Sequence, residues 1–194
     1  MSPNALRRQW RQGSGSALAR RRRVAGLALL SAGSMGVIAL YQLGLIKHLP
    51  DPPAPGVDSE AVVGSDEAYA RLDVPDAVLG LASYAVTLGL ATAGGADRAS
   101  RRPWLPLALG IKVTIDAAQA GRLALGQWPK HRALCSWCLL AAGATFAALP
   151  LAAPEVMEAW NNLTPGRKQA ALPGTVDDLR CGPRKGGEVH GGEA

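Results

Sequence analysis

Three stretches of the chain are free of charged residues and long enough to form membrane-spanning helices. They cover residues 24–46, 77–96 and 133–154 and contain 23, 20 and 22 residues. A helix needs about 20 apolar residues to cross the roughly 30 Å of hydrocarbon in a bilayer. The pattern therefore predicts three transmembrane helices.

A fourth segment, residues 104–125, is apolar at both ends but contains Lys112, Asp116 and Arg122. We count it as a further span, because three crossings alone would leave this apolar to amphipathic segment without a place in the fold. The sequence thus predicts an all-α membrane protein with a four-transmembrane-helix bundle, formed by residues 24–154.

The net charge of +6 is concentrated at the N-terminus, where residues 1–23 contain seven arginines and no acidic residue. This basic segment before an apolar helix predicts a cytoplasmic tail and favours contact with anionic lipid headgroups. Nucleic-acid binding is not favoured, because no aromatic and basic platform or recognition helix accompanies the arginines. A signal peptide has a shorter apolar core of about 7 to 15 residues, so the first span is expected to stay uncleaved.

With the N-terminus inside, the four spans place residues 47–76 and 126–132 outside, and residues 97–103 and 155–194 inside. The inside segments then contain 15 Lys and Arg residues, and the outside segments together with Arg122 contain five. This distribution agrees with the positive-inside rule. The tail at 155–194 is rich in glycine, proline and charge, which predicts a largely disordered cytoplasmic segment.

Two of the three cysteines, Cys135 and Cys138, form a C-x-x-C pair at the outer end of the last span. On one turn of helix the two sulfurs can form a reversible disulfide, and a helix N-terminus favours the reactive thiolate. Cys135 is therefore expected to face water and to react first, with Cys138 one turn deeper toward the membrane interior. Cys181, in the tail, is expected to be a free reduced thiol.

Other interpretations of the cysteine pair stay open. A static disulfide is permitted outside the cytoplasm, although a bridge across two residues constrains little of the unfolded chain. A zinc site needs about four ligands, and only His131 and His48 lie in the outer segments, so no metal is predicted. The C-x-x-C spacing alone also occurs by chance.

If the pair exchanges electrons from the aqueous side, the deeper sulfur needs a lipid-soluble two-electron carrier, and quinones are such carriers. Tyr84 and Trp137 are candidate contacts to a quinone ring, although both residue types also anchor helices at membrane interfaces. Lys112 and Asp116 are four residues apart on one helix face. They either neutralise each other or deliver protons to a reduced quinone.

The stretch DVPDAVLGLASYAVTLGL, residues 73–90, places Pro75, Leu79, Gly80 and Tyr84 ahead of the C-x-x-C pair. This order resembles the vitamin K epoxide reductase family, including its bacterial members, over roughly residues 24–153. The resemblance implies a four-helix bundle around a quinone, of ubiquinone or menaquinone type, with thiol oxidation coupled to quinone reduction. It also implies that Cys135 exchanges with an incoming thiol or disulfide and that Cys138 faces the quinone ring.

The same resemblance implies a multi-pass protein of the bacterial cytoplasmic (inner) membrane, with its C-x-x-C pair facing outside. Bacterial relatives support disulfide formation in exported proteins through a thioredoxin-like partner. The family commonly carries a second cysteine pair in the long outer loop, whereas residues 47–76 contain no cysteine. A thioredoxin-like exported thiol protein or a small thiol would then meet Cys135 directly. The alternative function is a non-catalytic four-helix membrane protein whose pair is a static disulfide or a partner contact.

Overall fold

The regular secondary structure of the computed structural model, which describes residues 2–69 and 74–164, is helical throughout these ranges. Cys181 and the rest of the predicted tail beyond residue 164 lie outside the described residues. The elements are α1 Pro3–Gln12, α2 Ser16–Gln42, α3 Ser59–Val63, a 3-10 turn at Asp66–Ala68, α4 Asp76–Thr92, α5 Arg98–Arg101, α6 Trp104–His131 and α7 Ser136–Leu163. The prediction of an all-α chain is confirmed.

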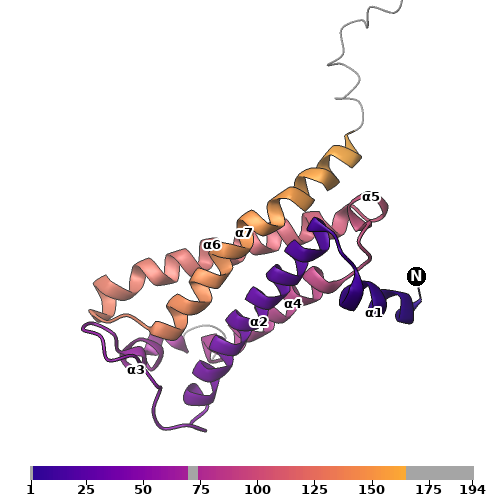
Figure 1. Cartoon of the computed structure of the whole chain (residues 1–194). Coiled ribbons are helices and arrows are strands. Elements are labelled where there is room, and N and C mark those ends of the chain that lie inside the picture. The colour runs from indigo at the N-terminus through magenta and orange to yellow at the C-terminus, as the bar shows by residue number, and fades with distance from the viewer. Residues whose placement is uncertain (1, 70–73, 165–194) are drawn as a thin grey trace, which may run out of the picture. The chain divides into compact units, whose positions relative to one another are not determined.

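The helices α2, α4, α6 and α7 pack side by side along most of their length (Figure 1). Helix α2 contacts α4 and α7, and α6 contacts α7 and α4. Helix α3 and the turn between α6 and α7 lie at one end of this bundle, whereas α1 and α5 lie at the other (Figure 1). The segments that carry the cysteines and the arginine-rich N-terminus are therefore at opposite ends.

Small side chains allow the helices to approach closely. The buried core consists of two clusters, and alanines are frequent in both: Val24, Ala25, Ala91, Leu109, Val113 and Ala148 in one, and Ile38, Ala39, Leu49, Val63, Ala77 and Cys135 in the other. At Gly110 of α6, an added Cβ would lie 2.6 Å from Cγ2 of Val156 on α7. Close packing of small residues is the usual way in which helices associate in a bilayer.

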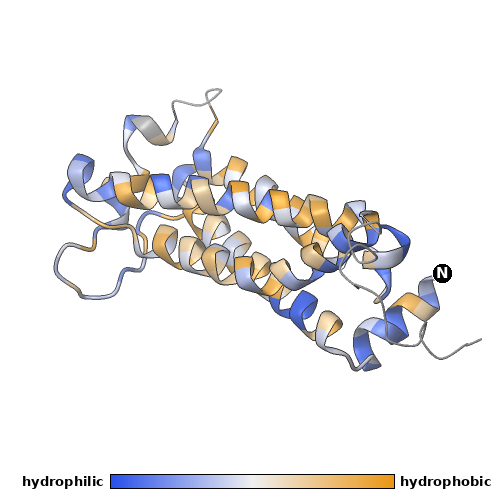
Figure 2. Ribbon diagram, turned by 90° about the horizontal axis from the view of Figure 1, so that it is seen from above, coloured by the Kyte–Doolittle hydropathy of each residue, from blue (hydrophilic) through white to orange (hydrophobic). Residues whose placement is uncertain are grey.

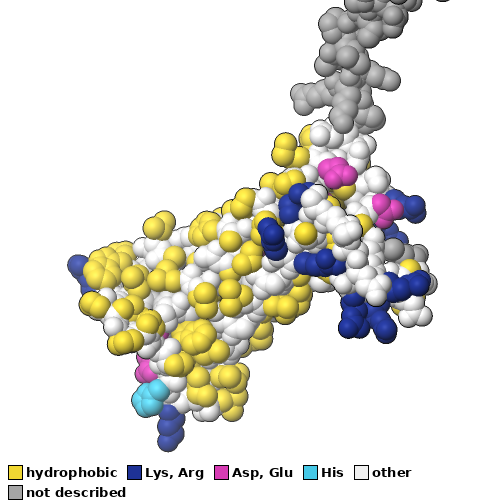
Figure 3. Space-filling model, viewed as in Figure 1, with side chains coloured by type: hydrophobic (Ala, Val, Ile, Leu, Met, Phe, Trp, Pro, Cys, Tyr) yellow, Lys and Arg dark blue, Asp and Glu magenta, His cyan; other side chains and the backbone are white. Residues whose placement is uncertain are grey.

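Large apolar side chains also cover the outside of the bundle. Figure 2 shows hydrophobic residues along the long helices, and Figure 3 shows them spread over the flank of the bundle. Ile111 and Leu125 of α6 are 64% and 81% exposed, and Val86 of α4 is 53% exposed. Within the described ranges, α2 and α7 are each long and apolar enough to cross a membrane, and α4 is a shorter apolar helix.

The ends of several helices differ from the sequence prediction. Helix α2 begins at Ser16, inside the segment expected to be a basic tail. Helix α6 continues through residues 126–131, expected to be an outer loop, and stops at Arg132, whose φ of 53° is left-handed. Lys130 and His131 thus occupy the last turn of α6, where positive charge is favoured by the helix dipole. Residues 155–163, expected in a disordered tail, form the last turns of α7.

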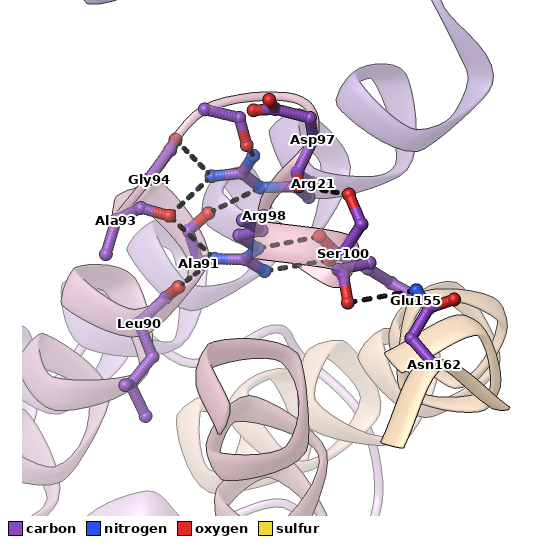
Figure 4. A network of polar contacts seen from close by, with 12 residues as sticks. Arg21, Leu90, Ala91, Ala93, Gly94, Asp97, Arg98, Ser100, Glu155 and Asn162 are labelled. Carbon is purple, nitrogen blue, oxygen red and sulfur yellow. Dashed lines mark hydrogen bonds and ion pairs between the residues drawn. The ribbon is translucent and has the colours of Figure 1, made fainter. Parts of the chain in front are cut away.

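A buried network of two arginines and one glutamate joins the helices at the end of the bundle near α1 (Figure 4). Arg98 donates from Nε and Nη2 to the two carboxylate oxygens of Glu155 on α7, at 2.6 and 2.8 Å. Arg21 of α2 donates to backbone carbonyls after the end of α4, including that of Ala93 at 2.8 Å. Since carbonyls at a helix C-terminus lack intrahelical partners, both arginines satisfy groups that would otherwise be buried alone.

Candidate functional site around Cys135 and Cys138

The two cysteines occupy the start of α7. Cys135 directly precedes the helix and Cys138 lies in its first turn, and both are free thiols. The backbone N–H of Cys138 donates to Sγ of Cys135 at 3.1 Å, and the N–H of Cys135 donates to Oε1 of Gln127 on α6 at 2.8 Å. A sulfur that accepts a backbone N–H at a helix N-terminus is in a setting that favours a thiolate.

The loop between α2 and α4 is tied onto this end of α7 by three side chains, which we call the loop clamp: Asp51, Ser59 and Ser136. The hydroxyls of Ser59 and Ser136 both donate to Oδ1 of Asp51, at 2.6 and 2.5 Å. The backbone N–H of Ser59 donates to Oδ2 of Asp51 at 2.7 Å, and that of Ser136 donates to the Ser59 hydroxyl at 3.0 Å. The clamp therefore joins the loop to the residue next to Cys135.

Further contacts hold the loop over the cysteines. Leu134 N–H donates to the Gly56 carbonyl at 2.8 Å, and the Asp58 N–H donates to the Leu134 carbonyl at 3.1 Å. Trp137 donates from Nε1 to the carbonyl of Pro50 at 3.1 Å. As a result Cys135 is 0% exposed. The expectation that Cys135 faces water is wrong in this conformation, because the loop packs on it.

Hydrogen bonding in the clamp keeps Asp51 ionised. Burial raises the pKa of the Asp51 carboxyl. Hydrogen bonds from the hydroxyls of Ser136 and Ser59 and from the Ser59 N–H together lower this pKa by more than burial raises it, so that it lies below its ordinary value. A depressed folded-state pKa stabilises the clamp above the unfolded value of about 3.9, and this contribution is lost as the pH falls through the folded value. The clamp is therefore charged and intact at neutral pH.

A cavity of about 850 Å³ lies beside Cys138. Its wall includes Cys138 of α7, Tyr84 and Gly80 of α4, Met35 of α2 and Asp116 of α6. Cavities of roughly 300–1,000 Å³ with apolar walls and a few polar groups are typical of small-molecule sites. Of the two aromatic residues proposed from the sequence, Tyr84 lines this cavity, whereas Trp137 is absent from its lining and contacts the loop instead.

Tyr84 is fixed inside the bundle by a hydrogen bond between its hydroxyl and that of Thr145 on α7, at 3.0 Å. The cavity rim carries basic side chains from the last turns of α6, Arg122, Lys130 and His131. Asp76, at the start of α4, lies in the same lining and accepts a hydrogen bond from Gln42 at 2.8 Å. The cavity thus has an apolar interior and charged groups toward the end of the bundle that holds the cysteines.

The sequence analysis missed the loop clamp and Gln127, which position Cys135. Serine, aspartate and glutamine are common in loops and at helix ends, so the sequence alone does not show which of them contact one another. Within residues 2–69 and 74–164, no group of three or more His, Cys, Asp or Glu side chains is arranged to hold a metal ion.

Comparison with protein families identifies one match. The model described as "Vitamin K epoxide reductase family" matches residues 23–153. This range is more than half of the 194 residues and includes both cysteines, Tyr84 and the whole cavity lining. No curated protein matches the chain.

Proposed function

Because the chain belongs to the vitamin K epoxide reductase family, a family of membrane oxidoreductases, we propose that it couples thiol and disulfide exchange at Cys135 and Cys138 to quinone reduction. The observation that carries the proposal is the position of the two sulfurs. Cys138 lines the cavity, and Cys135, whose sulfur contacts the Cys138 N–H, lies on the side of the outer loop. One sulfur can therefore meet a molecule in the bundle while the other meets a partner from the water phase.

The chemistry balances as a two-electron reaction. Two thiols lose two protons and two electrons and form one disulfide, and a quinone takes up both electrons and two protons. The cavity is large enough for a quinone headgroup. Tyr84, Gly80 and Met35 in its wall offer the apolar surface that would contact the ring. The quinone, of ubiquinone or menaquinone type, would be the electron acceptor. The chain would supply the two thiols and keep water away from the quinone ring.

The membrane arrangement that fits this reaction has four spans, built from α2, α4, α6 and α7. Support comes from the large apolar side chains exposed on all four, such as Leu29, Leu81, Ile115 and Phe146. The arginine-rich end with α1 is then in the cytoplasm, against anionic lipid headgroups, and the cysteine end is outside the bacterial inner membrane. Residues 24–154 form the membrane domain in this proposal.

Without cysteines in the outer loop, an external thiol has to reach Cys135 itself. We propose a thioredoxin-like exported thiol protein or a small thiol as this partner, with disulfide formation outside the cytoplasm as the outcome. The burial of Cys135 behind the loop clamp favours one other function, a non-catalytic membrane protein with a static disulfide or partner contact. The two functions differ in whether quinone changes the redox state of the pair.

Addition of oxidised quinone to the reduced protein in lipid nanodiscs is expected to convert both thiols of the pair to a disulfide. The measurement is the loss of two alkylatable thiols per chain, by mass spectrometry, with reduced quinone as the inactive control. A Cys135→Ser/Cys138→Ser variant corrects for Cys181. Thiols that stay alkylatable in the presence of oxidised quinone would support the non-catalytic function instead.

Substitution Asp51→Asn is expected to open the loop clamp and expose Cys135 to the outside. In a Cys138→Ser/Cys181→Ser background, where Cys135 is the remaining cysteine, a membrane-impermeant maleimide added outside should react about tenfold faster. The reason is that hydrogen bonds to a charged acceptor contribute about 1.5–3 kcal/mol each. The ratio of the two labelling rates, Asp51→Asn over the chain with Asp51, should stay flat as the pH falls from 7 to about 4, because the Asp51 pKa is depressed and the loss of reactive thiolate slows both reactions alike.

Asp58→Asn is the matched control for this experiment. Asp58 lies in the same loop but caps α3, accepting from the Ala61 N–H at 2.9 Å, and has no side-chain bond to Ser136 among those the structure describes. Its substitution should leave the labelling rate of Cys135 unchanged. Equal acceleration by both substitutions would show that the loop as a whole, and not the clamp, controls access to Cys135. Labelling of Cys135 from the cytoplasmic side alone would reverse the proposed membrane orientation.

A further inference from the structure

Four polar side chains form a closed cluster between α4 and α6, in the apolar part of the bundle. Lys112 donates to both carboxylate oxygens of Asp116, at 2.5 and 2.6 Å, and to the hydroxyls of Ser83 and Thr87, at 2.8 and 3.2 Å. Ser83 and Thr87 donate in turn to Oδ1 and Oδ2 of Asp116, at 3.0 and 2.9 Å. Each ammonium hydrogen has an acceptor, and each carboxylate oxygen has two donors.

Such a cluster is a poor way to stabilise a membrane bundle. Charged pairs in a low-dielectric interior gain little over well-packed apolar residues, since desolvation offsets their attraction. Ionisable residues within membrane helices therefore usually mark ion or proton pathways.

Asp116 does lie beside the cavity. It lines the cavity that Cys138 and Tyr84 also line, and it is 9% exposed. Lys112 lies one turn earlier on α6, and its side chain is 20% exposed. The carboxylate of Asp116 is thus the group through which the cluster reaches a bound molecule.

Titratable side chains from α4, α6 and α7 face Asp116 or the rim of its cavity. Helix α4 contributes Tyr84, α6 contributes Lys112 and, at the rim, Arg122, Lys130 and His131, and α7 contributes Cys138. Asp76 stands at the rim from the start of α4. The lining residues from α2 are untitratable: Val24, Leu27, Ala28, Ser31, Met35 and Ile38. Lys112 is the one titratable partner bonded directly to Asp116 among the described residues.

We propose that the Lys112–Asp116 pair delivers one of the two protons that the quinone takes up, with Asp116 as the group facing the cavity. This inference rests on the proposed thiol and quinone reaction. Oxidation of the two thiols forms one S–S bond and releases two electrons and two protons. Both electrons and one thiol proton go to the quinone, the second quinone proton comes from the pair, and the remaining thiol proton goes to water. Water returns one proton to the pair, so atoms and charge balance.

The test compares the wild-type chain with Asp116→Asn, which keeps the shape of the side chain but cannot transfer a proton. In a single turnover, oxidation of the Cys135 and Cys138 thiols by quinone should slow by about 10²-fold or more at neutral pH, as for loss of a general acid. The loss should shrink at acid pH, where solvent supplies the proton. Quinone binding, by equilibrium dialysis, and thiol exchange with a disulfide reagent should remain within about twofold of wild type.

Two further variants separate proton delivery from structure. Thr114→Val changes an exposed residue of α6 between Lys112 and Asp116, whose hydroxyl donates to the Gly110 carbonyl at 2.8 Å, and should retain the wild-type rate within a few fold. Lys112→Gln/Asp116→Asn removes both charges together, so it leaves no buried charge unpaired, and should show the same pH-dependent loss as Asp116→Asn. The inference is overturned if either variant that lacks Asp116 oxidises its thiols at the wild-type rate, or if Thr114→Val is as slow as they are. If the wild-type chain itself is not oxidised by quinone, the proposed function fails, which is a distinct result.

Discussion

Replacement of Cys138 by serine is expected to reduce quinone-coupled thiol oxidation to background and to trap the partner on Cys135. The trap uses the partner in its disulfide form: Cys135 attacks one partner sulfur, a mixed disulfide forms and the other partner sulfur leaves as a thiolate. Release of this mixed disulfide within the chain needs attack on Cys135 by the second thiolate, which the variant lacks. Because Cys138 is the sulfur that lines the cavity, the variant also lacks the thiol that would pass electrons to the proposed quinone. The trapped species is measured as a reducible adduct on non-reducing gels and identified by mass spectrometry.

The matched variant is Cys135→Ser, which should also lose turnover but give no adduct with the disulfide form of the same water-phase partner. Its remaining Cys138 lines the cavity. Cys181→Ser, which leaves the C-x-x-C pair intact, should turn over at the wild-type rate. Full activity of either single variant of the pair would eliminate the oxidoreductase proposal.

Combining Cys138→Ser with Asp51→Asn extends this experiment to the loop. Since the clamp holds the loop over Cys135, an open clamp should raise the yield of the trapped adduct. The size of this increase for a thioredoxin-like protein, relative to a small thiol, depends on how far the loop must move. A larger increase for the protein would indicate that it is the natural partner.

The sequence predicted the helical segments well because their signal is local. A run of about 20 uncharged apolar residues has few alternatives in any fold, so the segments around residues 24–46, 77–96 and 133–154 all contain long helices. The ends were less predictable. Glu155 looked like the start of a polar tail, yet it continues α7 because its carboxylate pairs with Arg98, a contact between residues 57 positions apart.

The site was predictable where chemistry depends on spacing. Cys135 and Cys138 are adjacent in any helix, and Lys112 and Asp116 share a face four residues apart, as the ion pair between them shows. The burial of Cys135 could not be predicted, because it depends on the way a proline-rich loop folds back through Asp51 and Ser59. Tyr84 and Trp137 looked equivalent in the sequence, and only the packing of α4 and α7 distinguishes the one that lines the cavity.

Breaking the Arg98–Glu155 pair should destabilise the folded chain more than any other substitution proposed here. Glu155→Gln leaves the guanidinium of Arg98, 1% exposed, without its charged partner. Removing one member of a buried pair costs about 3–5 kcal/mol, because the other charge stays desolvated. We expect a lower thermal midpoint, by about 10 °C, measured by scanning fluorimetry in detergent.

The exposed pair of Arg101 and Asp97 in the adjacent segment is the matched control, with side chains 80% and 52% exposed. Arg101→Gln should leave the midpoint unchanged, since exposed ion pairs contribute little. The double variant Arg98→Met/Glu155→Leu should recover much of the loss, because neither charge of this pair then remains buried. The Leu90 carbonyl loses its bond from Arg98, and the Ala93 carbonyl keeps its bond from Arg21. A double variant less stable than Glu155→Gln would mean that the bonds from Arg98 to the end of α4, and not its charge pairing, hold this end of the bundle together.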